Sequence, residues 1–338
     1  MSWSEVLYGA VGVIVFFGAT RGGPAELYSL GGDLLRKRWT RSALWIGRLL
    51  AAVPVPGYQV RGWLLLIDSY RARGSAGRAA KVATKFLEYL STTFEECQWH
   101  WLNSVIDALV SAGRYREAVA AQARWSARGR RSGRDSDPVS YAFTQINRAE
   151  AFFELGESAE ALSLLEHARP LAEPDAVARN GLLCLEAWIS IHEGELERAR
   201  DRLARVDVAA LSPVYAAEVH YTWAAYEREA KDLEHALQHA ERGLQSSVRP
   251  SSERNGLFMI ASIEALRGNH ARAKEHFERA VGHHYRGQGA DGLFRYAEFL
   301  ERTEGAHAAE PVYGLLIERD GESALATHAR RRISKLAA

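Results

Sequence analysis

Seven positions along the chain carry a glycine, or in one case a lysine, at nearly constant spacing, and this interval constrains the fold more than any other feature. The gaps between successive positions are 39, 43, 38, 37, 37 and 37 residues. Regular self-similarity at such a period is typical of repeat architectures. An apolar stretch of helical length precedes each position. We call these positions the markers: Gly74, Gly113, Gly156, Gly194, Lys231, Gly268 and Gly305.

An alanine stands five residues after six of the seven markers. A chain that leaves one helix and starts an antiparallel one needs a residue tolerant of positive φ, which glycine supplies. The second helix needs a small side chain where it crosses the first closely. Each unit is therefore predicted to be helix, tight turn, helix. The alanines are Ala79, Ala118, Ala161, Ala199, Ala236 and Ala273.

The strings around these positions resemble tetratricopeptide (TPR) repeats. They run from Ala108 to Ala118, from Asn147 to Leu162 and from Ala265 to Ala273. The resemblance covers residues 60 to 317 and implies an all-α fold, a right-handed superhelical solenoid of antiparallel helix pairs. The period is about 37 where the family has about 34. Lys231 replaces the marker glycine once, and Glu310 replaces the last alanine. The chain looks like the membrane-anchored bacterial members of the family.

An uncharged run from Val6 to Ala19 lies near the N-terminus. Counted from Trp3, it would make about 25 Å of helix, the short end of what spans a bilayer. Basic residues follow the run rather than precede it, so the positive-inside rule places the repeats in the cytoplasm. Residues 1–22 are therefore predicted to form a single-pass transmembrane anchor. The alternative is an apolar helix packed on the array.

Apolar and basic residues alternate at helical spacing through residues 23–58. This pattern fits a juxtamembrane helix on the bilayer surface, and it fits equally a helix pair that caps the first repeat. Residues 1–135 hold 19 Lys and Arg against 10 Asp and Glu, a net charge of +9, which favours an anionic leaflet as a partner. The predicted membrane-facing residues are Trp3, Tyr8, Phe16, Phe17, Arg36, Lys37, Arg38, Trp39 and Trp45.

The repeats are predicted to occupy residues 59–321. After Asp320 and Gly321, an Arg-rich amphipathic segment over residues 322–338 is expected to form a capping helix, because the open end of a solenoid must be covered.

No catalytic motif is present in the sequence. Cys97 and Cys184 are isolated, which argues against a zinc site or a disulfide framework and favours packing over a reactive thiol. His235 and His239 lie one helical turn apart, a spacing that can chelate a metal but more often marks a solvated helix face. We therefore expect no enzymatic activity, no cofactor, no metal and no nucleic-acid partner.

Partner binding can be localised by register. If each marker is the fifteenth position of a TPR-like unit, the family's concave positions fall on a set rich in aromatic residues and arginine, the types that anchor bound segments. This set is Phe143, Ile146, Glu150, Trp188, Tyr221, Arg228, Phe258, Arg295 and Phe299, and Trp101, one position off the register, is kept as a further candidate. The sequence thus predicts a membrane-tethered scaffold or adaptor that holds a peptide or helix in a concave groove. The alternative is a soluble regulator or sensor that binds a peptide or small effector.

Overall fold

The computed structural model describes residues 24–36, 39–94, 98–126, 137–247, 250–282 and 290–336. Within these ranges the chain forms 17 α-helices and one short 3-10 helix, and no strand. The all-helical prediction is confirmed for this part of the chain.

Fourteen of the helices form seven consecutive pairs, each joined at one marker. The first helices are α4 (Pro56–Ala72), α6 (Trp99–Val110), α8 (Pro138–Glu154), α10 (Ala176–His192), α12 (Pro213–Glu229), α14 (Pro250–Leu266) and α16 (Ala290–Thr303). The second helices are α5 (Ala76–Thr93), α7 (Tyr115–Ser126), α9 (Ser158–Ala172), α11 (Leu196–Leu203), α13 (Leu233–Ser246), α15 (His270–Gly282) and α17 (Ala306–Asp320). The 3-10 helix η2 (Val208–Ala210) lies between α11 and α12.

Every marker has a positive φ, as the turn requires. The six glycines have φ between 68° at Gly74 and 94° at Gly305, and Lys231 has φ of 67°. After α8 the amide of Gly156 donates to the carbonyl of Phe153, and that of Glu157 to Phe152, at 2.8 and 2.9 Å. This is the Schellman pattern, which satisfies the last carbonyls of a helix. All six predicted alanines are fully buried where the paired helices cross.

A further helix pair precedes the repeats, namely α2 (Pro24–Arg36) and α3 (Thr40–Ala52). Leu27, Ile46 and Leu50 form a small core with Leu65 of α4. Gly62 of α4 lies so close to α3 that an added Cβ would approach the backbone nitrogen of Ala51 to within 2.2 Å. The pair therefore packs on α4 and caps the first repeat. At the other end, α18 (Ala324–Leu336) packs against α17.

A search of the described helices for a membrane span contradicts the prediction of a single-pass anchor. In the described part of the chain, no helix combines the length and apolar character needed to cross a bilayer. The longest, α5 with 18 residues, carries Arg78, Lys81, Lys85 and Glu88.

The apolar run over residues 6–19 lies outside the described residues, as do the predicted membrane-facing residues Trp3, Tyr8, Phe16, Phe17, Lys37 and Arg38. Arg36 is the last residue of α2. The side chains of Trp39 and Trp45 on the capping pair are 63% and 49% exposed.

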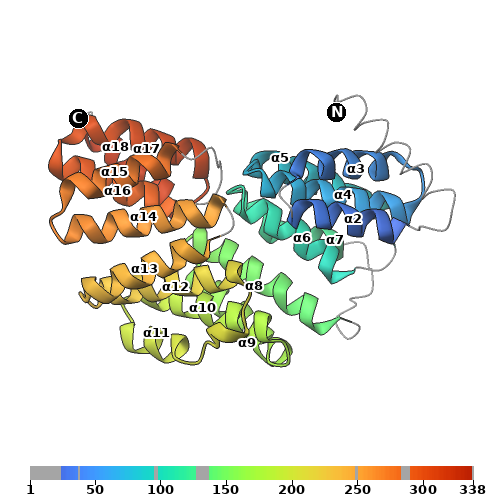
Figure 1. Cartoon of the computed structure of the whole chain (residues 1–338), viewed down its shortest axis with the longest axis horizontal. Helices are drawn as coiled ribbons and strands as arrows, with labels where there is room; N and C mark the ends of the chain where they lie inside the picture. Colours follow the sequence, from blue (N-terminus) through green and yellow to red (C-terminus); the bar gives the residue numbers. More distant parts are fainter. Residues whose placement is uncertain are drawn as a thin grey trace.

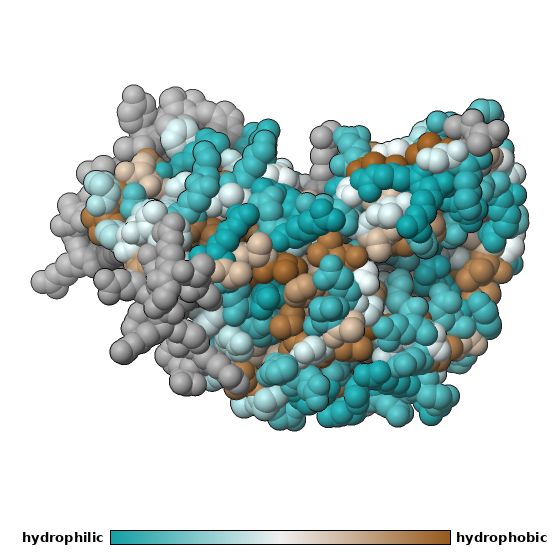
Figure 2. Space-filling view, turned by 180° about the vertical axis from the view of Figure 1, so that it is seen from behind, coloured by the Kyte–Doolittle hydropathy of each residue, from teal (hydrophilic) through white to brown (hydrophobic). Residues whose placement is uncertain are grey.

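The helix pairs follow a curved path that brings the two ends of the array together. In Figure 1 the helices up to α7 form one lobe, α8 to α13 form the base, and α14 to α18 form a second lobe facing the first. The opposite view in Figure 2 shows a surface hollowed between the two lobes, with apolar side chains near its centre. The first helices line the inside of this curve, because polar side chains of non-adjacent first helices reach one another there, as described next.

Candidate functional site

Three first helices end in an ionisable residue two positions before a marker. These are Glu154 at the end of α8, His192 at the end of α10 and Glu229 at the end of α12. Charged side chains of α12 and α16 join them on the inner face. We name this group the lumenal charge cluster: Glu154, His192, Arg228, Glu229, Asp291 and Arg295.

Glu229 connects helices that are not neighbours in the array. Its carboxylate accepts from Arg228 of the same helix at 3.0 Å and lies 3.7 Å from the guanidinium of Arg295 on α16. Helix α14 stands between α12 and α16 in the order of units. The curvature is therefore tight enough for side chains of units two apart to meet across the inner face.

Arg228 is the most buried charge in the cluster, with its side chain 2% exposed. Its remaining guanidinium nitrogen contacts the sulfur of Met259 on α14 at 3.6 Å. Burial, followed by the nearby Arg295, lowers the pKa of Arg228. Such a group is held charged by its acidic neighbours, and removing one of them would leave an unpaired buried charge.

Asp291 and Arg295 form a two-point pair within α16. The Arg295 Nε lies 3.0 and 2.9 Å from the two carboxylate oxygens of Asp291. Burial would raise the pKa of Asp291, but Arg295, Arg228 and His192 overcome it and lower the pKa to about 2. Asp291 therefore carries its charge at any physiological pH.

His192 adds an aromatic side to the cluster. Its ring centroid lies 5.3 Å from that of Phe153 and 5.0 Å from that of Trp188. Although the ring reaches solvent, the surrounding protein lowers its pKa, and the histidine is therefore mainly neutral near pH 7. Trp188 and His192, whose ring planes are inclined to each other by 58°, together place an aromatic surface beside the charges.

Glu154 is the least compensated acid of the cluster. Burial raises its pKa well above the ordinary value, and the negative charges of Asp320, Glu150 and Asp291 raise it further. It also stands at the C-terminal end of α8, where the helix dipole disfavours a negative charge. A cationic group close to the Glu154 carboxylate would offset the repulsion from the neighbouring acids and the unfavourable helix dipole.

The residues predicted from the register fall into two groups. Ile146, Tyr221, Phe258 and Phe299 are buried in the core, where Tyr221 fills the space over Gly243 and Gly256 and Phe258 lies against Gly292. In this arrangement they present little surface to a partner. Arg228 is also buried, but as part of the charge cluster.

The other predicted residues keep some exposed surface. Trp101 on α6 packs edge-on to Phe94 with centroids 5.0 Å apart. Phe143 and Glu150 on α8, Trp188 on α10 and Arg295 on α16 are half-buried. Of these, the structure brings Trp188 and Arg295 to the lumenal charge cluster, with Glu150 acting electrostatically on Glu154.

Sequence reasoning missed Glu154, His192, Glu229 and Asp291. A usable signal was present, because the first three stand at the same offset from their markers. The concave positions inherited from the TPR resemblance stop one residue short of this offset.

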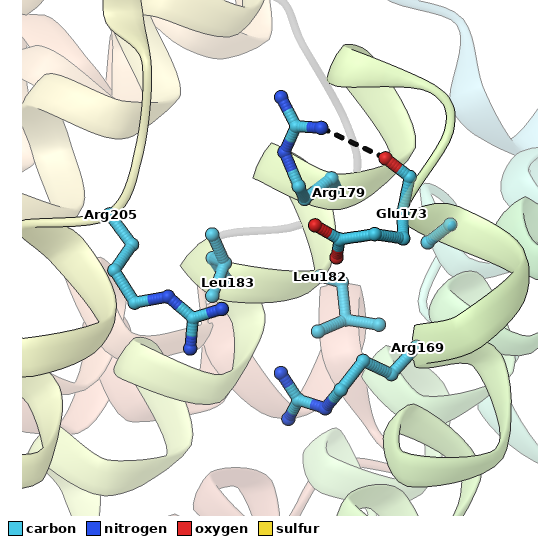
Figure 3. A pocket seen from close by; sticks show the side chains of 7 residues that line it. Arg169, Glu173, Arg179, Leu182, Leu183 and Arg205 are labelled. Atoms are coloured by element: carbon cyan, nitrogen blue, oxygen red, sulfur yellow. Dashed lines mark hydrogen bonds between the residues drawn. The ribbon is translucent and has the colours of Figure 1, made fainter.

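A small side pocket opens elsewhere, between α9, α10 and the segment after α11. Figure 3 shows Arg169, Arg179 and Arg205 around Leu182 and Leu183, with Arg179 donating to the carbonyl of Glu173 at 2.8 Å. Its internal volume is about 10 Å³, the space of one water. Arg169 is already paired with the buried Glu186, which also lies 3.0 Å from Arg202. Arg169 and Arg202 thus join α9 and α11 to the buried Glu186 of α10.

His235 and His239, the two histidines one helical turn apart, contact different partners. His235 bonds Asp232 at 2.7 Å, whereas His239 lies with its Nδ1 3.2 Å from the Nδ1 of His220 on α12. No group of three or more metal-ligating side chains occurs within the described ranges. Burial raises the pKa of the Cys184 thiol to about 12, so this cysteine is a packed thiol, and Cys97 lies outside the described residues.

Comparison with known proteins finds relatives only at the level of structure. No family model and no curated protein matches the chain. The Cut9–Hcn1 hetero-tetramer of the APC/C is 13% identical with a TM-score of 0.53, and the match covers 86% of this chain and 51% of that one. The matching structures are TPR repeat proteins. The fold is TPR-like.

Two further structures match nearly from end to end but with looser agreement. A tetratricopeptide repeat protein from Parabacteroides merdae ATCC 43184 is 12% identical, with 80% of this chain and 98% of that chain covered and a TM-score of 0.45. The apo form of RapI is 13% identical, with 92% and 98% covered and a TM-score of 0.46. The chain spans about half the length of the Cut9–Hcn1 match. At these identities the likeness concerns the fold alone.

Proposed function

We propose that the protein is a TPR-like interaction module, an adaptor or regulator, that binds a segment of a partner protein on its inner face at the lumenal charge cluster. The observation that carries the proposal is the reach of Arg295 to Glu229 across α14, at 3.7 Å. Charged side chains of separate units meet there on a surface that also bears the exposed ring of His192 and the half-buried ring of Trp188.

The charges of the cluster indicate the chemistry of the partner. Glu229 and Asp291 offset the positive charges of Arg228 and Arg295, and His192 is mainly neutral. Glu154 adds a further acid, whose pKa is raised well above its ordinary value. The two arginines are already engaged with Glu229 and Asp291. Glu154 alone faces only like charges, so a lysine or arginine side chain of the partner is the complementary group.

The aromatic side of the site fits an apolar residue near that basic one. Trp188 and His192 lie beside the cluster, and such amphipathic rings are frequent anchors at interfaces. The preferred partner is thus an extended or helical segment with adjacent basic and apolar side chains. No reaction is proposed for the site.

Site-directed photo-crosslinking tests the proposal. A benzoyl-phenylalanine placed at Trp188 should capture a specific protein from an extract of the source cells, because the new ring occupies the inner face. The same group at Gln238, exposed on the second helix α13, should capture nothing specific.

A charge-reversal variant tests whether crosslinking of the partner depends on the acidic side chain of Glu154. Glu154→Lys should lower the yield of the Trp188 crosslink at least tenfold, because it places a like charge where a basic partner residue is expected. Equal yields from Trp188 and Gln238, or an unchanged yield in Glu154→Lys, would contradict the proposal. Arg228, with its side chain 2% exposed, is unsuited to this test because reversal of a fully buried charge is a folding defect, whereas Glu154 keeps part of its surface exposed. Unchanged circular dichroism of Glu154→Lys is the control for folding.

A further inference from the structure

The end of the array returns to contact its beginning. The phenol of Tyr115, the first residue of α7, donates to Asp320 at the end of α17 over 3.1 Å. The amide of Arg116 donates to the carboxylate of Glu322 at 2.9 Å. Both bonds join residues more than 200 positions apart, and they bring the two lobes of Figure 1 into contact.

The same turn fits closely against two markers. A Cβ added to Gly113 would come within 2.5 Å of the Asp320 carboxylate, and one added to Gly156 would lie 3.3 Å from the Cβ of Ala324. Tyr115 and Asp320 are each 1% exposed. The contact is therefore a fitted one, although it consists of one turn, residues 320–324, rather than of helices packed along their length.

The contact between this turn and the start of α7, which we call the seam, also borders the lumenal charge cluster. Glu154 and Glu150 of α8 act on the same buried region as Asp320, and their negative charges oppose one another. Arg254 of α14 and Arg319 favour the charged form of Asp320. A small contact that holds like charges together gains their hydration when it opens, so its closure is only weakly favoured.

We infer that the turn over residues 320–324 is a latch, which holds the superhelix closed around the lumenal charge cluster and opens to admit a partner segment. The inference rests on the proposed function for the identity of what enters. It adds that the inner face is gated, and that the gate is the contact of Asp320 and Glu322 with the start of α7. Weakening this contact exposes the inner face, and fixing it shuts large molecules out.

Size-selective thiol labelling tests the latch without any partner. The reporter is the thiol of His192→Cys in a chain that also carries Cys97→Ser and Cys184→Ala. N-ethylmaleimide, which is small, should react at the same rate whether the latch is intact or weakened. A maleimide on a polyethylene glycol chain of about 5 kDa should react at least tenfold faster once Tyr115→Phe and Glu322→Ala are added. Gln238→Cys on the outer face is the matched control, and both reagents should label it equally in every background.

A disulfide lock provides the opposite change. Gly156→Cys with Ala324→Cys places two Cβ atoms about 3.3 Å apart, close to the range of about 3.5 to 4.5 Å that disulfides span. Lys231 shows that a side chain is tolerated at a marker. The oxidised lock should suppress labelling of the reporter thiol by the large reagent at least tenfold while the small one still reacts.

Three results would overturn the latch: equal access of the large reagent in intact and weakened chains, unchanged access in the oxidised lock, or failure of the cysteine pair to oxidise. If Tyr115→Phe lowers helicity, Glu322→Ala alone serves as the weakened chain. Failure of photo-crosslinking at Trp188 would count against the proposed function only, because the labelling rates decide the latch separately.

Discussion

Tyr115 donates a hydrogen bond of 3.1 Å to Asp320, although 205 positions separate the two residues in the chain. Both side chains are shielded from water at the seam between the second and last repeats. Burial raises the pKa of Asp320, while the bond from Tyr115 lowers it. The phenol therefore stabilises the charged form of a carboxyl group that burial disfavours.

Tyr115→Phe is expected to lower the free energy of unfolding by about 2 kcal/mol, because a buried acceptor loses a donor. Urea denaturation followed by circular dichroism measures the change. Tyr313→Phe is the matched control, since its phenol bonds Glu301 at 2.9 Å within the same repeat. Both variants should lose stability, but only Tyr115→Phe should open the inner face to large reagents. Loss of that distinction would show that the seam has no special role.

Replacing the marker Lys231 by glycine is expected to raise the stability of the fold. Its φ of 67° is strained for a side chain with a Cβ and free for glycine. Lys231→Gly should raise the free energy of unfolding by about 0.5 to 1 kcal/mol, allowing for the greater freedom of glycine in the unfolded chain.

Gly268→Ala provides the reverse change. A Cβ at Gly268 meets nothing within 4 Å, so the expected loss of about 1 kcal/mol comes from its φ of 81° alone. Gly113→Ala should lose more, because its Cβ would also press on Asp320 at 2.5 Å. Chemical denaturation of the three variants should rank them in this order, and a loss of stability in Lys231→Gly would refute the argument.

Protonation of His239 is expected to lower the stability of the fold in mild acid. Burial, and then the neighbouring His220, Arg242 and His235, lower its pKa to about 4. The unfolded chain has a histidine pKa of about 6.5, so it binds the proton first, and the folded state loses stability as the pH falls from about 6.5 towards 4. His239→Gln should show a smaller drop in melting temperature between pH 7 and pH 5.

His235 is the control with the opposite sign. Its hydrogen bond to Asp232 raises its pKa, so its contribution is present below pH 6.5 and is lost as the pH rises. His235→Gln should therefore make the acid-induced drop steeper. The same response from both variants would mean that general acid effects, rather than these local contacts, govern the melting temperature.

Arg228→Met should lower the free energy of unfolding by about 1 to 2 kcal/mol, because the partly exposed Glu229 and Asp291 lose one of their two basic neighbours. Arg198→Met is the comparison, since its pair with Glu195 at 2.9 Å is exposed and should contribute less than about 1 kcal/mol. Adding Glu229→Gln to Arg228→Met should restore part of the loss. Thermal denaturation that fails to separate the two arginines would contradict the assignment of Arg228 as a buried, paired charge.

The repeats themselves could be predicted from the sequence, because local geometry dictates them. A helix that ends in a tight turn needs a positive φ whatever surrounds it, so each marker, Lys231 included, identified its turn. Ala118 and its counterparts follow from the same local crossing of two helices. These rules act within one unit and need no knowledge of the neighbouring units.

The arrangement of the units relative to one another could not be predicted in this way. Whether Tyr221 and Phe258 face a groove or the core depends on how closely successive units pack, and the long period leaves both options open. The meetings of Glu229 with Arg295 and of Tyr115 with Asp320 depend on the accumulated curvature of several units. Small rotations per repeat determine that curvature, and no single motif encodes them.

The return of the last turn to the early repeats also depends on the number of units. An open solenoid can gain or lose a repeat at small cost, because each unit touches only its neighbours. Here a deletion or duplication would carry Asp320 away from Tyr115, so the closure selects arrays of one length. It also couples the stability of the two ends, and the chain should therefore melt more cooperatively than an open array of the same units.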